Sequence, residues 1–568
     1  MKILELDVDN ITYEMMKPES SVYEQTEEKK ASVDDALVLL ISVEKGDDTA
    51  LADRAVGDVK TFLAQLKRQR VVVYPFAHLS TELAPPKEAM ALVDYMFQKL
   101  SEGYETKKAP FGWNKALALR IKGHPMAERS KRYSAPSITA QPQQNKPQTG
   151  AAKPLDRSIV TKSDFAGLPD TDHRTIGERL DLFSFQGVSP GMVYWHNNGY
   201  IIFNALLDLM REKYHEYSYE EISTPAIANL ALWDVSGHID HYKKEMFTFD
   251  ADGEQLGLKA MNCPSAILVY KSRKWSYRDL PIRLAEFGTI YRNEISGALT
   301  GLFRVREITQ DDTHLFVRED QIVEEMTKII SIVDSLYKKF GFEYKANLST
   351  MPDDHMGTPE FWEKATGKLK EALDANKVSY KIKDKEGAFY GPKIDIDIKD
   401  SMGREWQCAT IQLDYQQPQR FGLEYTGEDG KQHMPVVIHK AIYGSIERFI
   451  GILTEHYQGK FPTWIAPVQA RVISISEAAN EFAEKTYKDI RSNGIRVELD
   501  NSDKTLEYKI RDAQLHKIPY MIVIGKKEVD SNTVAVRTRS GGQKFGVKIE
   551  EFIAKVKVET ETRVDSPN

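Results

Sequence analysis

The chain has 568 residues, 41% of them hydrophobic and 28% charged, and a net charge of −7 at pH 7. This length predicts several domains, and the composition is that of an ordinary globular protein. The charge argues against indiscriminate nucleic-acid binding but leaves room for local basic surfaces. Because we find neither a signal peptide nor a run of about eighteen apolar residues, we expect no membrane span. Only two cysteines, Cys263 and Cys408, exclude a disulfide framework and favour a cytoplasmic location.

Residues 1–130 alternate strand and helix patterns. ALVLLISVE (36–44) and VVVYPF (71–76) are continuous apolar runs, which predict strands buried on both faces. ALADRAVGDVKTFLAQLKRQ and KEAMALVDYMFQKLSEGY carry apolar residues at helical spacing. We therefore expect a compact α/β domain here. The segment that follows is rich in Pro, Gln, Ser and Lys, which predicts a flexible linker over 131–165.

A second, larger domain is predicted over 166–467. WHNNGYIIFNALLDLMREKYHEYSY has the pattern of a long amphipathic helix, and EEISTPAI reads as a strand carrying Pro225. Short strands then dominate to about residue 420, and a helical pattern returns at 441–458. Strand and helix patterns alternate again over 468–560, which favours a largely parallel sheet with covering helices. We expect residues 561–568 to form a frayed tail.

The stretch RNEISGALTGLFRVREITQDDTHLF (292–316) carries opposed charges and two glycines between strand-like segments. A strand–loop–strand would direct Arg292, Glu294 and Arg304 at one ligand. Guanidinium groups pair bidentately with phosphate oxygens and stabilise charge that develops during phosphoryl transfer. A cross-strand ladder of ion pairs on an exposed hairpin explains the stretch equally well, so both interpretations stay open.

Two further segments favour the ligand-binding interpretation. PVVIHKAIYGSIERFIG (435–451) combines a strand, a small-residue turn and a helix bearing Arg448, and GAFYGPKIDIDIKD and REWQCATIQLDY supply polar side chains on strands. Together with SGHIDHYKKEMF, MNCPSAI, LAEFGTIYRNE, RVREITQDDTH and FPTWIAP, in this order across 175–467, they make the chain resemble the class II aminoacyl-tRNA synthetases, specifically the threonyl-tRNA synthetase family.

The resemblance implies a multidomain protein that combines α/β and α+β parts. Its catalytic core (166–467) would be an antiparallel sheet flanked by helices, preceded by an α/β editing domain (1–130) and followed by an α/β anticodon-binding domain (468–560). Pro225 would belong to a dimer-interface motif, which implies a homodimer. The implied reaction activates L-threonine with ATP and Mg²⁺ to threonyl-adenylate and transfers it to tRNA(Thr).

The family also implies residue roles in the core. Arg292 would orient the α-phosphate, Arg304 would hold the triphosphate, and Arg448 would contact ATP beside the base. Glu294 would read adenine, although Ile308 stands where bacterial members place an aromatic ring against that base. Three more residues are implied in catalysis: Lys393, Gln407 near the nucleotide, and His238 in the transfer step.

A metal site rests on Cys263, His314 and His439. Their spacing contains no local ligand pair, and each residue alone fits a structural role equally well. The family uses cysteine, histidine and histidine at these positions, which implies one Zn²⁺ per subunit with an open coordination position. Zinc that takes both the amino and hydroxyl groups would accept threonine and reject valine. The substrate would be surrounded by Asp312, Gln310, Tyr390 and Gln412.

Serine has the same hydroxyl and lacks only a methyl group, which is worth roughly 1–3 kcal/mol, so such a site needs proofreading. YPFAHLSTELA (74–84) and KAPFGWNKALALRIKGHPMAERS (108–130) resemble the archaeal editing domain, which is itself similar to D-aminoacyl-tRNA deacylases. This implies hydrolysis of seryl-tRNA(Thr), with His78, Lys115 and Glu128 lining the pocket. Asn114 stands where the family often has tyrosine.

KKEVDSNTVAVRTRSGG resembles the anticodon-binding domain and places Glu528 and Arg537 at positions that contact anticodon bases, with Arg539 and Lys526 near phosphates. Two alternatives remain. One is a related synthetase for serine or proline, and the other is an inactive synthetase-like RNA-binding regulator. Amino-acid-dependent ATP–pyrophosphate exchange distinguishes all three.

Overall fold

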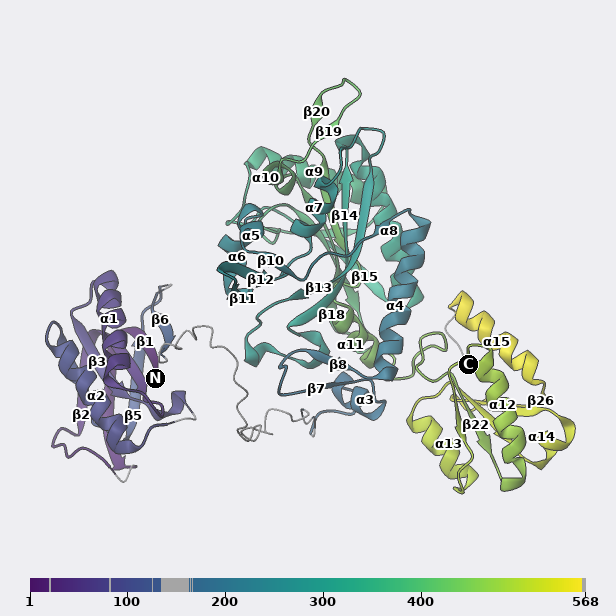
Figure 1. Cartoon of the computed structure of the whole chain (residues 1–568), viewed down its shortest axis with the longest axis horizontal. Helices are drawn as coiled ribbons and strands as arrows, with labels where there is room; N and C mark the ends of the chain where they lie inside the picture. The colour runs from purple at the N-terminus through teal and green to yellow at the C-terminus, as the bar shows by residue number, and fades with distance from the viewer. Residues whose placement is uncertain are drawn as a thin grey trace, which may run out of the picture. The chain divides into compact units, whose positions relative to one another are not determined.

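The structure, a computed structural model, describes residues 1–19, 22–80, 83–124, 126–133, 163, 165 and 167–563. It divides into two compact units, 1–152 and 153–568 (Figure 1). Almost all of the predicted linker 131–165, and the last five residues of the predicted tail, lie outside the described residues. In the described part, no helix combines the length and the apolar character needed to cross a membrane.

The first unit is a mixed sheet covered by two helices. The strands follow the order β4-β3-β2-β1-β5, and β6 pairs with β1 beyond the end of β5. Their bounds are β1 (Lys2–Pro18), β2 (Lys30–Ser42), β3 (Arg70–Pro75), β4 (Glu105–Lys108), β5 (Trp113–Ile121) and β6 (Glu128–Arg132). Leu37 and Leu39 of β2 pack with α1 (Thr49–Leu66) and α2 (Pro86–Ser101), whereas Val38 belongs to the apolar cluster on the opposite face. The prediction of a strand buried on both faces is confirmed.

The second unit contains an eight-stranded sheet in the order β16-β15-β17-β18-β21-β14-β13-β9. All neighbours are antiparallel except the β15–β16 and β13–β9 pairs, so the expected antiparallel core is confirmed. The strands are β9 (Glu220–Glu221), β13 (Ile282–Tyr291), β14 (Glu307–Val317), β15 (Glu343–Ser349), β16 (Tyr380–Lys383), β17 (Lys393–Lys399), β18 (Glu405–Asp414) and β21 (Val436–Ala441).

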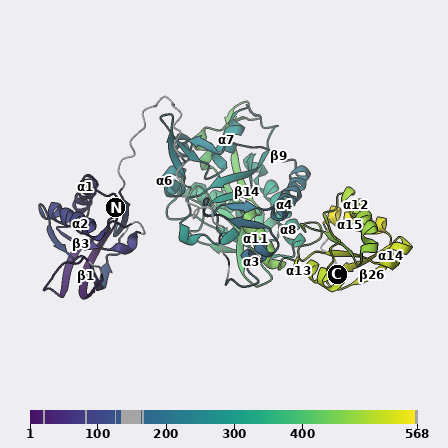
Figure 2. The same ribbon diagram turned by 60° about the horizontal axis from the view of Figure 1, so that its bottom comes forward.

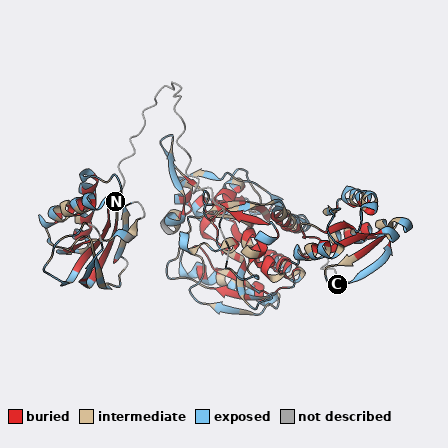
Figure 3. Cartoon of the chain, turned by 90° about the horizontal axis from the view of Figure 1, so that it is seen from below, coloured by how far each residue is buried: buried red, intermediate tan, exposed pale blue. Residues whose placement is uncertain are grey.

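One apolar cluster joins this sheet to the helices that cover it. These are α3 (His173–Arg179), α4 (Asn197–Glu216), α8 (Ile322–Lys339), α9 (Pro359–Ala375) and α11 (Ile446–His456). Figure 2 gives a second view of the helices around β14, and Figure 3 shows the buried strands inside a more exposed surface. The predicted helices at 195–219 and 441–458 correspond to α4 and α11.

Three local predictions for this unit were wrong in whole or in part. The expected strand at EEISTPAI is only Glu220–Glu221, and Pro225 lies beyond it, since the Thr224 amide donates to the Glu286 carboxylate and proline has no amide proton for a ladder. The region up to residue 420 is not dominated by strands, because α8 and α9 lie there. LFRVREIT (302–309) is a strand only from Glu307, where β14 begins, and residues 292–306 form a loop, named here the β13–β14 loop.

The last part of the chain forms a five-stranded sheet in the order β23-β22-β24-β25-β26. The strands are β22 (Ala470–Ser474), β23 (Val497–Asp500), β24 (Tyr520–Ile524), β25 (Val534–Thr538) and β26 (Gln543–Val547), with helices α12 (Asn480–Ser492), α13 (Leu506–Leu515), α14 (Lys526–Ser531) and α15 (Ile549–Thr562). Only β22, β23 and β24 are parallel; β25 pairs antiparallel with both β24 and β26, and the connections that lead to and from it are shorter than a parallel crossover requires. The predicted tail is helical as far as Thr562.

Candidate active site

A cavity of about 310 Å³ opens on the central strands of the eight-stranded sheet. Alternation along β14 directs Ile308, Gln310, Asp312 and His314 to this face, since side chains two residues apart share one side of a strand. The cavity brings together ten predicted site residues: Arg292, Gln310, Asp312, His314, Cys263, Tyr390, Gln407, Gln412, His439 and Arg448. Segments nearly two hundred residues apart in sequence therefore meet in one pocket.

Cys263, His314 and His439 form a tight buried cluster at this cavity. Cys263 begins α7 (Cys263–Lys271), and His314 and His439 are directly opposite each other on β14 and β21. The ligand atoms of the three side chains all lie within 4.8 Å of one another. This closeness makes the three side chains a candidate ligand set for one ion.

The surroundings of the cluster fit a bound metal ion. His314 Nε2 is buried and has no hydrogen-bond partner among the described residues. Burial holds the pKa of His314 well below its usual range, so the ring is neutral and one of its nitrogens has a lone pair for a metal ion. His439 Nε2 lies 3.0 Å from Asp414 Oδ2, the arrangement in which a carboxylate orients a metal-binding imidazole through its other nitrogen. Burial raises the pKa of the Cys263 thiol well above its usual value, and a cation is what would favour its thiolate. One thiolate and two imidazoles suit Zn²⁺ and leave a coordination position open.

Polar groups for an amino acid lie beside this cluster. Asp312 Oδ2 accepts a hydrogen bond from Asn262 Nδ2 at 3.0 Å, and burial raises the pKa of Asp312 to about 6. The Tyr390 hydroxyl donates to Gln412 Oε1, and the Tyr390 ring lies 5.4 Å from the His439 ring. These side chains define a small, directional pocket rather than an apolar one.

Two of the predicted arginines, Arg292 and Arg448, line the same cavity, and Arg304 does not. Arg292 Nη2 lies 3.4 Å from Met261 Sδ, and its buried Nε has no hydrogen-bond partner among the described residues. Arg448 Nε donates to the Phe303 carbonyl at 3.0 Å. Arg304 donates to Glu294 Oε2 at 2.8 Å, so these two predicted nucleotide-binding residues pair with each other. The ion-pair interpretation of the stretch therefore holds for Arg304 and Glu294 alone.

Lys393 and His238 do not line the cavity but contact residues that do or their neighbours. Lys393 Nζ donates to Asp395 Oδ2 at 2.6 Å, and Gln407 Nε2 donates to the other oxygen of Asp395 at 2.7 Å. His238 is buried on α6 (His238–Tyr242), with Nε2 3.8 Å from Cys263 Sγ and Nδ1 2.7 Å from Ser236 Oγ. Lys393 thus orients its neighbours, and His238 packs against the metal cluster.

Two buried carboxylates that the sequence analysis did not single out hold the site together. Asp311 accepts the amide protons of Ile442 and Tyr443, which fixes the turn before α11. Both oxygens of Glu447 lie 3.0 Å from the Thr309 amide, and burial raises the pKa of Glu447 to about 7. The alternation of QDD along β14 places Asp311 on the face opposite Asp312, which is the signal that could have identified it.

The first unit has its own cavity, about 370 Å³ in volume, lined by residues of β2, β3 and β5. Lys115 lies in it, with Nζ 3.2 Å from the Trp113 carbonyl and 5.0 Å from the centre of the Tyr74 ring. Burial lowers the pKa of Lys115 to about 8. Asn114 also lines the cavity.

Glu128, which was predicted for the same pocket, is not among the described residues that line it. Glu128 is exposed on β6 and pairs with Leu6, whereas Lys115 pairs with Met15, nine residues farther along β1, or roughly 30 Å at the rise of a strand. Within one chain Glu128 therefore lies away from this cavity, and its part in editing stays a prediction. The backbone of His78 belongs to the short helix η1 (Ala77–Leu79), but its side chain is outside the described ones.

In the C-terminal sheet, Glu528 accepts a hydrogen bond from the Gly525 amide at 2.9 Å, at the start of α14. Arg537 lies on β25 opposite Gln543, and its Nε is buried without a hydrogen-bond partner among the described residues. Arg539 donates to the Phe461 carbonyl at 2.5 Å, so the structure uses it within the chain rather than leaving it for a phosphate.

The antiparallel sheet and its convergent arginines define a class II aminoacyl-tRNA synthetase core, and a family model of that core, described for the G, H, P, S and T enzymes, matches residues 242–457. Residues 1–133 match a model described as the archaea-specific editing domain of threonyl-tRNA synthetase, and 469–559 match an anticodon-binding domain. Related sequences and solved structures narrow the class further.

The threonine–tRNA ligase of Clostridium tetani is 50% identical over 393 residues, which cover 69% of this chain. The chain spans 62% of the length of that relative. A threonyl-tRNA synthetase structure from Cryptosporidium parvum, titled as the RNA-binding domain, is 42% identical with a TM-score of 0.67 and covers 70% of this chain and 99% of its own. A structure titled putative threonyl-tRNA synthetase, from Aeropyrum pernix, is 28% identical with a TM-score of 0.61, over 69% of this chain and 96% of its own. The chain belongs to the threonyl-tRNA synthetase family.

Proposed function

We propose that this protein activates L-threonine with ATP, attaches it to tRNA(Thr), and hydrolyses seryl-tRNA(Thr) in its first unit. The observation that carries the proposal is the buried Cys263, His314 and His439 cluster in the same cavity as Asp312 and the arginines. A bound Zn²⁺ would supply a Lewis acid that takes the amino and hydroxyl groups of threonine. Valine has no hydroxyl group for the coordination position that the threonine hydroxyl would take.

The protein's own residues would do the rest. Asp312 would accept the substrate hydroxyl proton in a hydrogen bond, and Tyr390, Gln310 and Gln412 would border the amino acid. Arg292 and Arg448 line the cavity and would hold the α-phosphate and the nucleotide. Because the attacking carboxylate and the α-phosphate are both anionic, guanidinium charge that is already in place would stabilise the transition state most. Mg²⁺ would accompany the ATP phosphates.

Arg304 would bind the triphosphate and Glu294 the adenine, each leaving the other when ATP enters. Gln407, oriented by the same Asp395 that holds Lys393, would lie near the nucleotide. His238 would act in the transfer step through its position beside Cys263. These assignments extend the family pattern to the positions of this chain.

Editing would occur in the cavity that contains Lys115. The Lys115 ammonium would donate hydrogen bonds to the bound ester, its lowered pKa easing transfer of a proton, and water positioned by the ribose hydroxyl of the tRNA would attack the seryl ester. Glu528 and Arg537 would read anticodon bases. We infer a cytoplasmic homodimer, with Pro225 near the subunit interface.

The test combines amino-acid-dependent ATP–pyrophosphate exchange with metal analysis of the full chain. We expect about one zinc per chain and exchange with threonine but not with valine or proline. Cys263→Ser should lose both metal and exchange, whereas the matched variant Cys408→Ser, which changes another buried thiol of the same cavity, should keep its metal. Threonine-specific exchange by a zinc-free Cys263→Ser chain would overturn the proposal. Exchange with serine or proline alone, or none, would favour the two alternatives.

A further inference from the structure

We propose that His173 is a positioning residue for nucleotide binding, which holds the β13–β14 loop (292–306) against α11 so that Arg304 and Arg448 face ATP. The inference rests on the proposed function, and His173 is not among the site residues predicted from the sequence. His173 is fully buried on α3, outside the cavity that holds the substrate groups.

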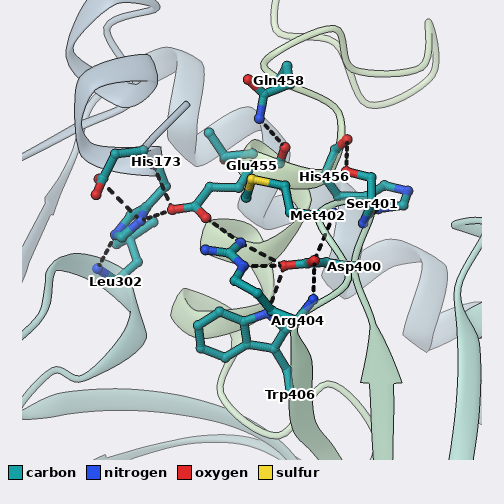
Figure 4. Close-up of polar contacts among 12 residues, drawn as sticks. His173, Leu302, Asp400, Ser401, Met402, Arg404, Trp406, Glu455, His456 and Gln458 are labelled. Atoms are coloured by element: carbon teal, nitrogen blue, oxygen red, sulfur yellow. Dashed lines mark hydrogen bonds and ion pairs between the residues drawn. The ribbon is translucent and has the colours of Figure 1, made fainter. Parts of the chain in front are cut away.

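Both ring nitrogens of His173 make defined hydrogen bonds (Figure 4). The Leu302 amide donates to Nε2 at 3.0 Å, so Nε2 carries no proton. The proton must therefore sit on Nδ1, which donates to Glu455 Oε1 at 2.7 Å. The His173 amide donates to the same oxygen at 2.9 Å. A single neutral tautomer thus links the β13–β14 loop to a carboxylate of α11.

Glu455 is itself held in place. Its other oxygen accepts from Arg404 Nη2 at 2.5 Å, and Arg404 Nε donates to Asp400 Oδ2 at 2.7 Å. Trp406 Nε1 donates to that same Asp400 oxygen at 2.9 Å. The network therefore joins the turn between β17 and β18 to the last turn of α11, and His173 extends it to the loop (Figure 4).

Phe303, the residue before Arg304, is held by two ring contacts and one hydrogen bond. The Phe303 ring centre lies 4.1 Å from that of His173 and 4.4 Å from that of Trp406. Its carbonyl accepts the Arg448 Nε hydrogen bond. Fixing Phe303 consequently fixes both the start of Arg304 and the guanidinium of Arg448.

Two glycines permit this close packing. A Cβ at Gly301, whose φ is +52°, would lie 2.3 Å from His173 Nε2. A Cβ at Gly451 of α11 would lie 3.0 Å from Phe303 Cε1. The loop thus touches His173 and α11 where side chains are absent, and small displacements of His173 pass directly to the loop.

The same residues do not form a second metal site. Ligand atoms of Asp172, His173 and Glu455 lie within 4.8 Å of one another, but both nitrogens of His173 are engaged and Asp172 pairs with Arg174 at 2.8 Å. The competing explanation is a purely structural role for His173. Loss of such a role would lower stability without raising the KM for ATP more than the KM for threonine.

The test uses His173→Gln, His173→Asn and His173→Ala in the full chain. An amide oxygen of glutamine reaches the Nε2 position and can accept from the Leu302 amide, whereas asparagine reaches only the Nδ1 position and can serve Glu455. We expect His173→Ala and His173→Asn to raise the KM for ATP at least fivefold and to leave the KM for threonine within twofold. His173→Gln should recover most of the ATP affinity. His215→Gln, an exposed histidine on α4, is the matched control.

Equal increases in both KM values, or better ATP affinity in His173→Asn than in His173→Gln, would overturn the inference. If the histidine variants do not fold, Gly301→Ala displaces the loop from the other side and should produce the same ATP-specific loss; an unchanged KM for ATP would count against it. Calorimetry with MgATP reports the same binding without amino acid. A wild-type chain that binds ATP but shows no threonine-dependent exchange would refute the proposed function and leave this inference to be decided by the binding data.

Discussion

Replacing Lys115 by methionine should stabilise the first unit while abolishing its proposed editing activity. Burial lowers the pKa of Lys115 from 10.5 to about 8, so folding at pH 7 places a protonated amine where the charged form is disfavoured. The difference corresponds to about 3 kcal/mol, because each pH unit is worth about 1.36 kcal/mol. The Trp113 carbonyl and the Tyr74 ring offset part of this cost, and methionine, of similar length, cannot use them. A net gain of about 1–3 kcal/mol is expected.

The sign of the pH dependence is fixed by the direction of the pKa change. The folded state binds fewer protons than the unfolded state between about pH 8 and 10.5, so the cost of Lys115 is complete below pH 8 and disappears as pH rises to 10.5. The advantage of Lys115→Met should therefore shrink by more than half between pH 7 and pH 9.5.

The gain in the free energy of unfolding is measured at both pH values by urea denaturation of the full chain, with unfolding of the first unit detected by proteolysis. Lys17→Met, which removes an exposed lysine from the neighbouring strand β1, is the control and should change stability little. Seryl-tRNA(Thr) deacylation is measured on the same preparations. A destabilised Lys115→Met chain, or a gain that does not change with pH, would refute the reasoning.

Three further predictions concern the rest of the chain. Arg283→Met removes the bidentate partner of the buried Glu325 carboxylate, 2.6 and 2.7 Å away, and leaves only Lys328 at 2.8 Å, so it should lower the free energy of unfolding in urea by about 1–3 kcal/mol. Arg283→Met combined with Glu325→Leu should recover most of this loss, and a double variant as unstable as the single one would contradict the reasoning. Gly444→Ala places a Cβ 2.6 Å from the Cys408 carbonyl at φ +75° and should reduce exchange by displacing Arg448, while Gly494→Ala, with φ +81° and open space, should not; equal effects would remove the steric argument. A chain lacking residues 1–133 should retain threonine-dependent exchange but accumulate seryl-tRNA(Thr), and unchanged serine misacylation would argue against editing in the first unit.

The sequence predicted those parts of the site that depend on local periodicity. Alternation along 307–317 already places Gln310, Asp312 and His314 on one face of a strand, and the turn before Arg448 is readable from small residues. The register that sets His314 opposite His439 is not, because it joins segments more than one hundred residues apart and depends on the whole sheet. Only the family pattern pointed to that pair.

Other features escaped prediction for reasons of tertiary structure. Residues 302–306 have the composition of a strand, but the hydrogen bond from the Leu302 amide to His173 Nε2 holds them in a loop. Glu128 is close to Lys115 in sequence and far from it in the sheet, because β5 and β6 pair with different halves of β1. Alternation shows on which face of β14 Asp311 lies, but the backbone amides that Asp311 and Glu447 bind leave no pattern in the sequence.

The ion pair between Arg304 and Glu294 gives the site an internal competitor. If Arg304 binds the triphosphate as we propose, a phosphate that takes the Nε contact displaces the Glu294 carboxylate, and this displacement would lower the affinity of simple polyanions. A ligand that offers a phosphate to the cation and a hydrogen-bond donor to the released carboxylate recovers both halves of the broken pair. The Arg304–Glu294 ion pair would therefore favour ligands that carry both a phosphate and a hydrogen-bond donor.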